Sequence, residues 1–572
     1  MPAHNAEIAA MLDRLADLLE IEGENPFKVR AYRNAALTVQ GLSRSIADMV
    51  KAGETLTELP GIGDAIAKKL TEIVQTGHFT KLEQESRHIP ATLTDLLKIP
   101  SLGPKRVHIL FDKLKIKDEQ DLESAVQNGK VRELDGFGAK TELKIREYLD
   151  MQKTSVRRMP IAEAEQIVTP LAEYLAQVAG VKQVVPAGSY RRRMETVGDL
   201  DFLGTCTQAE AAMAAFVAYD EVKEVLARGD TKSSVVLRSG LQVDLRVVPE
   251  ESFGAALNYF TGSKAHNIAL RTRGQKLGLK LNEYGVFKGE RAVAGRTEDE
   301  VYRSLGLGTI APELRENRGE IEAAEQGTLP RLVTLKDIRG DLQSHTSATD
   351  GKNTLEEMAA AAQARGLEYL AITDHSKRVA MARGLNATRL RQEIKAIDKL
   401  NAVLKGFVVL KSIEVDILED GSLDLSDDVL KDLDIVVAAV HSYFQLSREK
   451  QTERIVRAMD NPLVHILAHP TGRIIGERPP YEVDMEQLLR AAKERGCFVE
   501  LNAHPDRLDL NDVHARMAGE LGVKVAISTD AHRAEDFDLM RFGVDQARRA
   551  WLTPAAVLNT LPWPDLQKLL RR

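Results

Sequence analysis

The spacing of hydrophobic positions changes twice along the chain. Up to about residue 150, apolar residues recur at helical spacing in short segments separated by proline and glycine, which predicts an almost wholly helical region. From about residue 160, apolar runs bounded by turn residues predict strands, among them 181–190, 198–206 and 240–249. Beyond residue 335, strand-like runs alternate with amphipathic helices, which is typical of parallel βα units. The pattern therefore predicts a helical, a mixed and an α/β region in one chain.

Composition narrows the class of protein. At 572 residues the chain is too long for one core and should form several domains. Hydrophobic residues at 43% and charged residues at 28% are ordinary for a globular protein and exclude a disordered one. The net charge of −7 gives no global sign of a nucleic-acid partner, although a local phosphate-binding face is compatible with it. With only Cys206 and Cys497 present, a disulfide framework and a cysteine-rich zinc site are excluded.

The chain lacks the features expected of an exported or membrane protein. Its first 20 residues follow an amphipathic pattern that includes acids, without the basic-then-apolar order of a signal peptide. No apolar run approaches the roughly 20 residues that a membrane span requires. We therefore expect a cytoplasmic protein without a membrane partner.

One pattern recurs three times in the helical region, at 59–70, 99–110 and 134–145. In each copy a glycine turn leads into a helix, whose first N–H groups lie at the positive end of the helix dipole and can bind phosphate of any DNA sequence. A single copy would most simply be a turn between helices, but three copies followed by lysines favour binding to the DNA backbone. They resemble helix-hairpin-helix motifs, the middle copy being the weakest because Ser101 replaces the usual glycine. The glycines predicted to bind DNA are Gly61, Gly63, Gly103, Gly136 and Gly138.

Three carboxylates in the mixed region suggest a metal-dependent reaction. In a strand, Asp199 and Asp201 project from the same face, and Asp244 interrupts the apolar run of another predicted strand. Adjacent carboxylates repel one another unless a cation lies between them, and Mg²⁺ or Mn²⁺ suits such oxygen ligands. Three carboxylates holding two metals would suit in-line phosphoryl transfer.

A glycine–serine turn precedes these acids. Gly188 and Ser189 offer a backbone amide and a hydroxyl to a phosphate, and Arg192 offers a planar guanidinium. Alone, the turn could equally be a surface feature beside solvated arginines. Followed by Asp-x-Asp, it resembles the nucleotidyltransferase pattern, and residues 259–271 (YFTGSKAHNIALR) narrow the resemblance to the family X, polymerase beta-like DNA polymerases.

The resemblance implies roles for individual residues. It implies metal ligation by Asp199, Asp201 and Asp244, and contacts to the sugar of the incoming nucleotide from Tyr259, Phe260 and Gly262. The triphosphate contacts that it implies come from Ser189, Arg192 and Gly198, and Gly188 belongs to the same predicted nucleotide-binding set. Asn267 would reach the minor-groove edge of the incoming base, and Arg271 the template strand. The family further implies a monomer that uses dNTPs to fill gaps in gapped or nicked duplex DNA, in base excision repair or end processing.

Lys69 is a further candidate. It lies where some relatives carry a lysine that attacks an abasic deoxyribose phosphate as a Schiff base. A second basic residue often found four positions earlier is here Ala65, so a contact to DNA phosphate is the alternative role.

In the α/β region, residues able to bind metal follow successive predicted strands. In a βα barrel such residues converge on one mouth, so a single site is expected. The pattern resembles the PHP (polymerase and histidinol phosphatase) family, a distorted (β/α)₇ barrel with three metals. The family would pair His345, Glu414 and Asp530 on one metal. It would pair Glu414, His441 and His469 on a second, and Asp350, His375 and His532 on a third.

This chain departs from the PHP pattern at Gln343, where a histidine is usual. Mixed imidazole and carboxylate ligands suit Mn²⁺ or Zn²⁺. In a polymerase, the resemblance implies that the barrel is a 3′–5′ exonuclease or a 3′-phosphoesterase.

We expect a multidomain protein of α+β and α/β class. The predicted parts are a lyase-like helical domain (1–82), fingers (83–155), palm (156–255), thumb (256–320), linker (321–335) and PHP barrel (336–572). Two other functions are compatible with parts of the sequence: a histidinol-phosphate-like phosphatase with a DNA-binding appendage, and a DNA-end-binding scaffold without activity. The segment 259–271 opposes the first alternative, and the three intact aspartates oppose the second.

Overall fold

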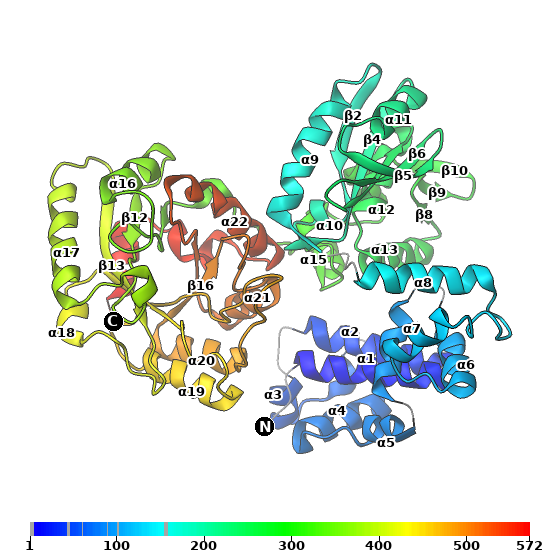
Figure 1. Ribbon diagram of the computed structural model, residues 1–572, viewed down its shortest axis with the longest axis horizontal. Helices are drawn as coiled ribbons and strands as arrows, with labels where there is room; N and C mark the ends of the chain where they lie inside the picture. Colours follow the sequence, from blue (N-terminus) through cyan, green and yellow to red (C-terminus); the bar gives the residue numbers. More distant parts are fainter. Residues whose placement is uncertain are drawn as a thin grey trace. The chain divides into compact units, whose positions relative to one another are not determined.

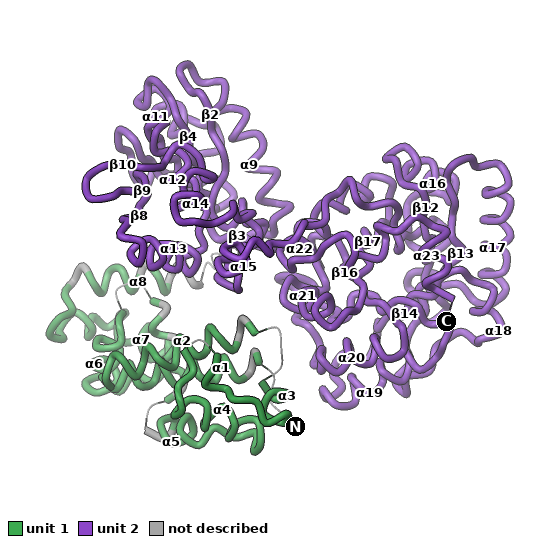
Figure 2. Tube along the Cα trace, turned by 180° about the vertical axis from the view of Figure 1, so that it is seen from behind, with its two compact units in different colours: residues 1–156 green, residues 157–572 purple. Residues whose placement is uncertain are grey.

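A computed structural model describes residues 5–42, 46–59, 61–88, 90–99, 102–153 and 158–571. The chain divides into two compact units, residues 1–156 and 157–572 (Figure 2). Within the described residues, no helix has both the length and the apolar character needed to cross a membrane.

The described secondary structure of the first unit is helical throughout, with turns between the helices, as the sequence predicts (Figure 1). Two buried clusters form its core, and helix α1 contributes to both: Leu12 and Leu15 pack in one, Leu18 and Ile21 in the other. A helix buried on two sides in this way links the two halves of the unit. The helices are α1 (Asn5–Ile21), α2 (Pro26–Gly41), α3 (Ile46–Lys51), α4 (Asp64–Thr76), α5 (Thr80–His88), α6 (Pro104–Leu114), α7 (Glu119–Gln127) and α8 (Ala139–Lys153).

The predicted glycine turns do lead into helices. Gly61 and Gly136 have φ of 75° and 83°, in the left-handed region that glycine adopts without strain. Gly63 and Gly103 are the residues immediately before α4 and α6, and having no side chain they leave the first N–H groups of those helices uncovered. Ser101 and the side chain of Lys140 lie outside the described residues.

A mixed five-stranded sheet forms the centre of the residues from 158 to about 255, in the order β2-β4-β7-β6-β5. Its one parallel pair is β4–β7, and Asp201 faces Asp244 across it. The three predicted strands are β2 (Val181–Pro186), β4 (Asp199–Cys206) and β7 (Gln242–Val247), joined by β5 (Val222–Arg228) and β6 (Lys232–Leu237). A short pair, β1 (Met159–Pro160) and β3 (Thr196–Val197), and helices α9 (Ile161–Ala176), α10 (Gly188–Arg191), α11 (Ala209–Val217) and α12 (Phe253–Thr261) complete this part.

A small sheet and three helices follow. Its strands run β10-β9-β8 and pair antiparallel. Arg315, almost wholly buried, is held by Glu298, which also pairs with Arg191 beside the mixed sheet. The elements are α13 (Lys264–Lys276), β8 (Lys280–Asn282), β9 (Gly285–Lys288), β10 (Arg291–Ala294), α14 (Glu298–Ser304) and α15 (Glu320–Gln326).

The remaining residues form a parallel seven-stranded barrel whose strands follow sequence order. An isolated parallel bridge between Ser344 and Ala531 brings the last strand back to the first. The strands are β11 (Gly340–Asp341), β12 (Tyr369–Ile372), β13 (Val408–Asp416), β14 (Ile435–Ala439), β15 (Ile466–Leu467), β16 (Phe498–Asn502) and β17 (Val525–Ser528). The helices are α16 (Leu355–Ala364), α17 (Ala387–Asn401), α18 (Asp427–Leu430), α19 (Arg448–Met459), α20 (Met485–Arg495), α21 (Asp512–Leu521), α22 (Met540–Arg549) and α23 (Trp563–Leu570).

The barrel and the mixed sheet share a buried apolar contact. Leu508 and Phe542 of the barrel belong to the same core cluster as Leu200 of β4 and Leu171 of α9. Ion pairs surround this contact, among them Arg473–Glu195 and Arg541–Glu165. The two parts therefore form one continuous body, as their common unit indicates.

Candidate active sites

Three carboxylates lie at one end of the β4–β7 pair. Asp199 is exposed at the start of β4, whereas Asp201 is half-buried and faces Asp244 on β7. Burial, together with the Asp199 and Asp244 carboxylates, raises the pKa of Asp201 to about 6. A carboxyl whose ionisation is hindered by burial and by neighbouring acids fits a site for divalent cations, which supply positive charge.

The glycine–serine turn lies directly against these acids. It forms the short helix α10, and the backbone N–H of Ala187 donates to the Asp201 carbonyl at 2.7 Å. Gly188 has φ of 60°, and a β-carbon there would lie 2.7 Å from Asp201 Oδ2. Arg192 follows the turn, with its Nη1 donating to the Thr261 carbonyl at 2.6 Å. The absence of a side chain at Gly188 thus allows the turn and the carboxylate to approach each other.

One cavity of about 850 Å³ joins the acids to the turn. Asp199 and Asp201 line it, and Asp244 supports Asp201 from the neighbouring strand. Every predicted nucleotide-binding residue lines it as well: Gly188, Ser189, Arg192, Gly198, Tyr259, Phe260, Gly262, Asn267 and Arg271.

The aromatic side of the cavity is tightly held. The rings of Tyr259 and Phe260 meet edge to face at 5.1 Å. Asn267 Nδ2 donates to the Tyr259 carbonyl at 2.7 Å, and Arg271 Nε donates to the Asn267 carbonyl at 3.3 Å. The first bond holds the start of α13 against the end of α12, and the second orients the Arg271 side chain along α13.

Several cavity residues were not predicted from the sequence. Arg158, Lys264 and Arg318 add positive charge, and Asn511, Asp512, Gln546 and Arg549 come from the barrel. No motif contains the barrel residues, because they reach the cavity only through contacts between domains: α22 bonds to the residues that follow α10, and Asp512 of α21 pairs with Arg318.

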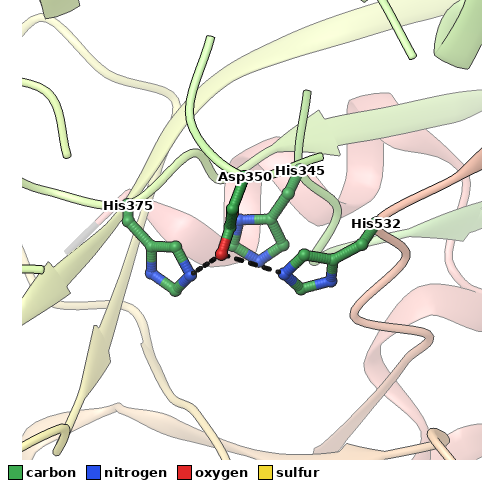
Figure 3. A group of neighbouring side chains, drawn as sticks. All are labelled: His345, Asp350, His375 and His532. Atoms are coloured by element: carbon green, nitrogen blue, oxygen red, sulfur yellow. Dashed lines mark ion pairs between the residues drawn. The ribbon is translucent and has the colours of Figure 1, made fainter. Parts of the chain in front are cut away.

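The second cluster lies at the carboxyl ends of the barrel strands, where it was predicted. Figure 3 shows His345, His375 and His532 arranged around Asp350, whose Oδ2 lies 3.5 Å from His375 Nε2 and 3.6 Å from His532 Nε2. Ligand atoms of all four residues lie within 4.8 Å of one another. The same is true of His375, Glu414 and His441.

Glu414 is the centre of this cluster. Its Oε1 lies 2.9 Å from His469 Nε2 and 3.3 Å from His441 Nε2. Its Oε2 lies 2.9 Å from His375 Nδ1, and Asp530 Oδ1 lies 3.0 Å from His345 Nε2. All the predicted histidine and acid ligands therefore converge. His375 belongs both to the group around Asp350 and to the group around Glu414, so the geometry alone does not divide the ligands among three metals.

The donors of this cluster fit metal ions. Asp350 Oδ1 and His345 Nδ1 are buried without a hydrogen-bond partner among the described residues. Gln343 has only 1% of its surface exposed, and neither its amide oxygen nor its nitrogen has a partner there. Buried polar atoms are normally paired, so unpaired ones gathered at a barrel mouth suit bound cations. The backbone N–H of Asp530 donates to the Gln343 carbonyl at 3.1 Å, which joins Gln343 to the cluster.

Two acids that support the cluster were missed. Asp416 Oδ1 lies 3.1 Å from His441 Nδ1 and directs the other ring nitrogen toward Glu414. Glu500 accepts a hydrogen bond from the backbone N–H of His469 at 2.7 Å. The spacing of Asp416, two residues after Glu414 in the same strand, was a signal that could have identified it.

Family profiles match the chain in the order that the fold suggests. A helix-hairpin-helix domain matches residues 3–79, and a SAM-like helix-hairpin-helix tandem matches 93–150. The DNA polymerase beta palm matches 158–255 and the DNA polymerase beta thumb matches 256–316. The PHP domain matches 341–504.

Similar proteins cover either the whole chain or between a third and two fifths of it. The DNA polymerase/3′–5′ exonuclease PolX of Bacillus subtilis is 39% identical over 576 residues, which is 100% of both chains. A probable phosphatase of Thermoanaerobacter sp. is 33% identical over 235 residues, 38% of this chain and 89% of its own. A probable phosphatase of Acetivibrio thermocellus is 32% identical over 211 residues, 35% of this chain and 82% of its own. Because the similarity to the first protein spans palm, thumb and barrel alike, the chain belongs to the family X DNA polymerases that carry a C-terminal PHP domain.

Proposed function

We propose that this protein is a template-directed polymerase that fills short gaps in duplex DNA during repair, and that its PHP domain removes nucleotides from 3′ ends. The observation that carries the first part is the cavity in which Asp199 and Asp201 of β4 meet the phosphate turn α10, with Asp244 of β7 paired in register with Asp201. The Bacillus subtilis relative, named as a polymerase and 3′–5′ exonuclease, supports both parts. A phosphatase with a DNA-binding appendage would not need the palm and thumb, and a scaffold would not need the three aspartates.

In the polymerase site, Asp199, Asp201 and Asp244 would hold Mg²⁺ or Mn²⁺. When bound, two such ions acidify the primer 3′-hydroxyl and neutralise the charge of the triphosphate. The turn at Gly188 and Ser189 offers its N–H groups to the triphosphate, and Arg192 adds a planar cation. Tyr259, Phe260 and Gly262 form the wall for the sugar, while Asn267 and Arg271 are proposed to contact the incoming base and the template strand.

The DNA partner is proposed to be gapped or nicked duplex DNA, bound by a monomer. The glycine turns before α4 and α6 present helix N-termini suited to backbone phosphate. The division into helical domain (1–82), fingers (83–155), palm, thumb, linker and barrel remains our proposal for how the chain is organised. We propose the cytoplasm as its location because its substrates, DNA and dNTPs, are present there.

In the PHP domain, His345, Glu414, Asp530, His441, His469, Asp350, His375 and His532 would hold Mn²⁺ or Zn²⁺. When bound, these ions activate water for hydrolysis of a phosphoester. Asp416 would accept a hydrogen bond from Nδ1 of His441 and so fix the ring with its Nε2 facing the site.

Removal of a 3′-phosphate is a second candidate activity for the same site. The relatives that match 38% and 35% of this chain are named probable phosphatases, and these names favour it. Both activities would clear a 3′ end before synthesis.

Incorporation of dNTPs into a duplex with a one-nucleotide gap tests the proposal. The parent protein should fill the gap, and Asp201→Ala should lower the rate by several orders of magnitude because it removes a carboxylate that would hold the cations. DNA binding should survive, since the glycine turns belong to other elements. Near-normal gap filling by purified Asp201→Ala would contradict the assignment.

A further inference from the structure

Helix α22 of the PHP domain lies against the residues that follow the phosphate turn. Two consecutive carbonyls that follow α10 accept hydrogen bonds from it: Arg549 Nη1 donates to the Arg192 carbonyl at 2.8 Å, and Gln546 Nε2 donates to the Arg193 carbonyl at 2.9 Å. The Arg193 guanidinium in turn pairs with Asp545 of α22 at 2.6 Å. The backbone that carries the phosphate-binding residues is thus fixed by a helix of another domain.

Arg549 also acts on the side chain of Arg192. Its Nη1 lies 3.1 Å from Glu316 Oε1, and the same oxygen accepts from Arg192 Nε at 3.0 Å. Glu316 therefore bridges the two guanidinium groups. With Nε bound to Glu316 and Nη1 bound to the Thr261 carbonyl, the plane of the Arg192 guanidinium is fixed at the wall of the cavity.

Asp512 holds Arg549 from its other side. Arg549 Nη2 donates to Asp512 Oδ2 at 2.8 Å, and Arg318 Nη1 donates to the same atom at 3.0 Å. Only 2% of the Arg549 side chain is exposed, so these bonds are shielded from water and leave it little freedom. Loss of Arg549 would leave Glu316 with Arg192 alone and Asp512 with Arg318 alone, and removal of a cation from such a buried network is costly.

We propose that Arg549 and Gln546 of the PHP domain are positioning residues for the triphosphate subsite of the polymerase. The proposal rests on the proposed polymerase function. Arg549 holds the Arg192 backbone directly and the Arg192 side chain through Glu316, and Gln546 holds the next carbonyl. The barrel therefore forms part of the nucleotide site, in addition to its own metal centre. None of the bonds made by these two side chains involves a predicted metal ligand, so the two roles of the domain are independent.

The test measures dNTP binding in full-length variants. Arg549→Ala should raise the KM for dNTP on a one-nucleotide gap by about tenfold or more, with a smaller change in kcat, because binding is lost rather than chemistry. The Kd for dNTP of the complex with a dideoxy-terminated primer should rise in parallel. Gln546→Ala should act in the same direction more weakly, and Arg549→Lys, which keeps the charge but not the planar fork, should restore part of the loss.

Arg541→Ala is the matched control. Arg541 also lies on α22 and pairs with Glu165 of the palm, but it does not line the cavity, so its loss should leave KM unchanged. Unchanged 3′-end removal by Arg549→Ala would show that the barrel of this variant is folded. If the Arg549→Ala barrel does not fold, the KM and Kd of Gln546→Ala test the proposal instead. An unchanged or lowered KM and Kd, or an equal effect of Arg541→Ala, would overturn the inference. If the parent protein fills no gap, the proposed function fails, while the dNTP Kd still tests the role of Arg549.

Discussion

At the scale of single residues, the two active sites differ in how far the sequence could define them. Asp199 and Asp201 were identifiable because residues two apart share one face of a strand, and the structure pairs Asp201 with Asp244. Arg549 and Glu316 were not identifiable, because their contact spans 233 residues and depends on how α22 packs. Local spacing predicts neighbours within an element, and it cannot predict ion pairs that form between domains.

Gly188 shows how one residue controls the polymerase site. Gly188→Ala would place a β-carbon 2.7 Å from Asp201 Oδ2 and a side chain at φ of 60°. We expect gap filling to fall by about tenfold or more, since a displaced ligand loses alignment with the reacting groups. Steady-state incorporation measures it. Gly240→Ala is the control, because its φ of 85° imposes similar backbone strain with nothing within 4 Å. Equal activity of the two variants would contradict this account of Gly188.

Gln343 is the residue at which the chain departs from the PHP pattern. Its amide is buried without a partner among the described residues, which fits a weak oxygen ligand or a water-filled place beside a cation. An oxygen-rich site favours Mn²⁺ over Zn²⁺ more than an imidazole would. We therefore expect 3′-end removal to be strongly stimulated by Mn²⁺ and weak with Zn²⁺ alone.

Gln343→His should bind the metal ion next to residue 343 more tightly and raise the rate of 3′-end removal at limiting Mn²⁺. Titration of metal content and of 3′-end removal in the two proteins measures the effect. A chelator should remove the metal ion next to residue 343 more readily from the parent protein than from the variant. Equal stoichiometry and equal Mn²⁺ dependence would mean that Gln343 has no influence on the site.

At the scale of elements, most of the predicted strands and helices were correct because their patterns are long and regular. The three strands of the mixed sheet, the glycine turns and the alternating barrel follow from periodicity and turn residues. The short helix α10 was expected only as a turn, since four residues are too few to show helical spacing.

Helix α4 carries Lys69, for which the sequence leaves two roles open: Schiff-base lyase and DNA-phosphate contact. Lys69 is half-buried, and Ala65 one turn earlier supplies no neighbouring cation to hold a phosphate. We expect Lys69→Ala to weaken binding to gapped DNA a few-fold, by loss of one phosphate contact, and borohydride not to trap the parent protein on an incised abasic duplex. Lys68→Ala, at the exposed neighbouring position, is the control. If the parent and Lys68→Ala are trapped and Lys69→Ala is not, Lys69 acts as a Schiff-base lyase.

At the scale of the whole molecule, the palm and the barrel form one body with two separate centres. Their interface combines the apolar contact of Leu508 and Phe542 with several ion pairs, and it brings α22 to the nucleotide cavity. The candidate metal-ligand cluster lies instead at the carboxyl ends of the barrel strands. The account therefore predicts shared structure and separable chemistry.

The measurement that tests this claim most directly is a comparison of gap filling and 3′-end removal in the same preparations of the parent, Asp201→Ala and His375→Ala. His375 belongs to both metal-ligand groups of the barrel, so His375→Ala should abolish 3′-end removal and leave gap filling near the parent rate. Asp201→Ala should have the opposite effect. Loss of both activities in a folded single variant, or loss of neither, would contradict the assignment of polymerase chemistry to the palm and nuclease chemistry to the barrel.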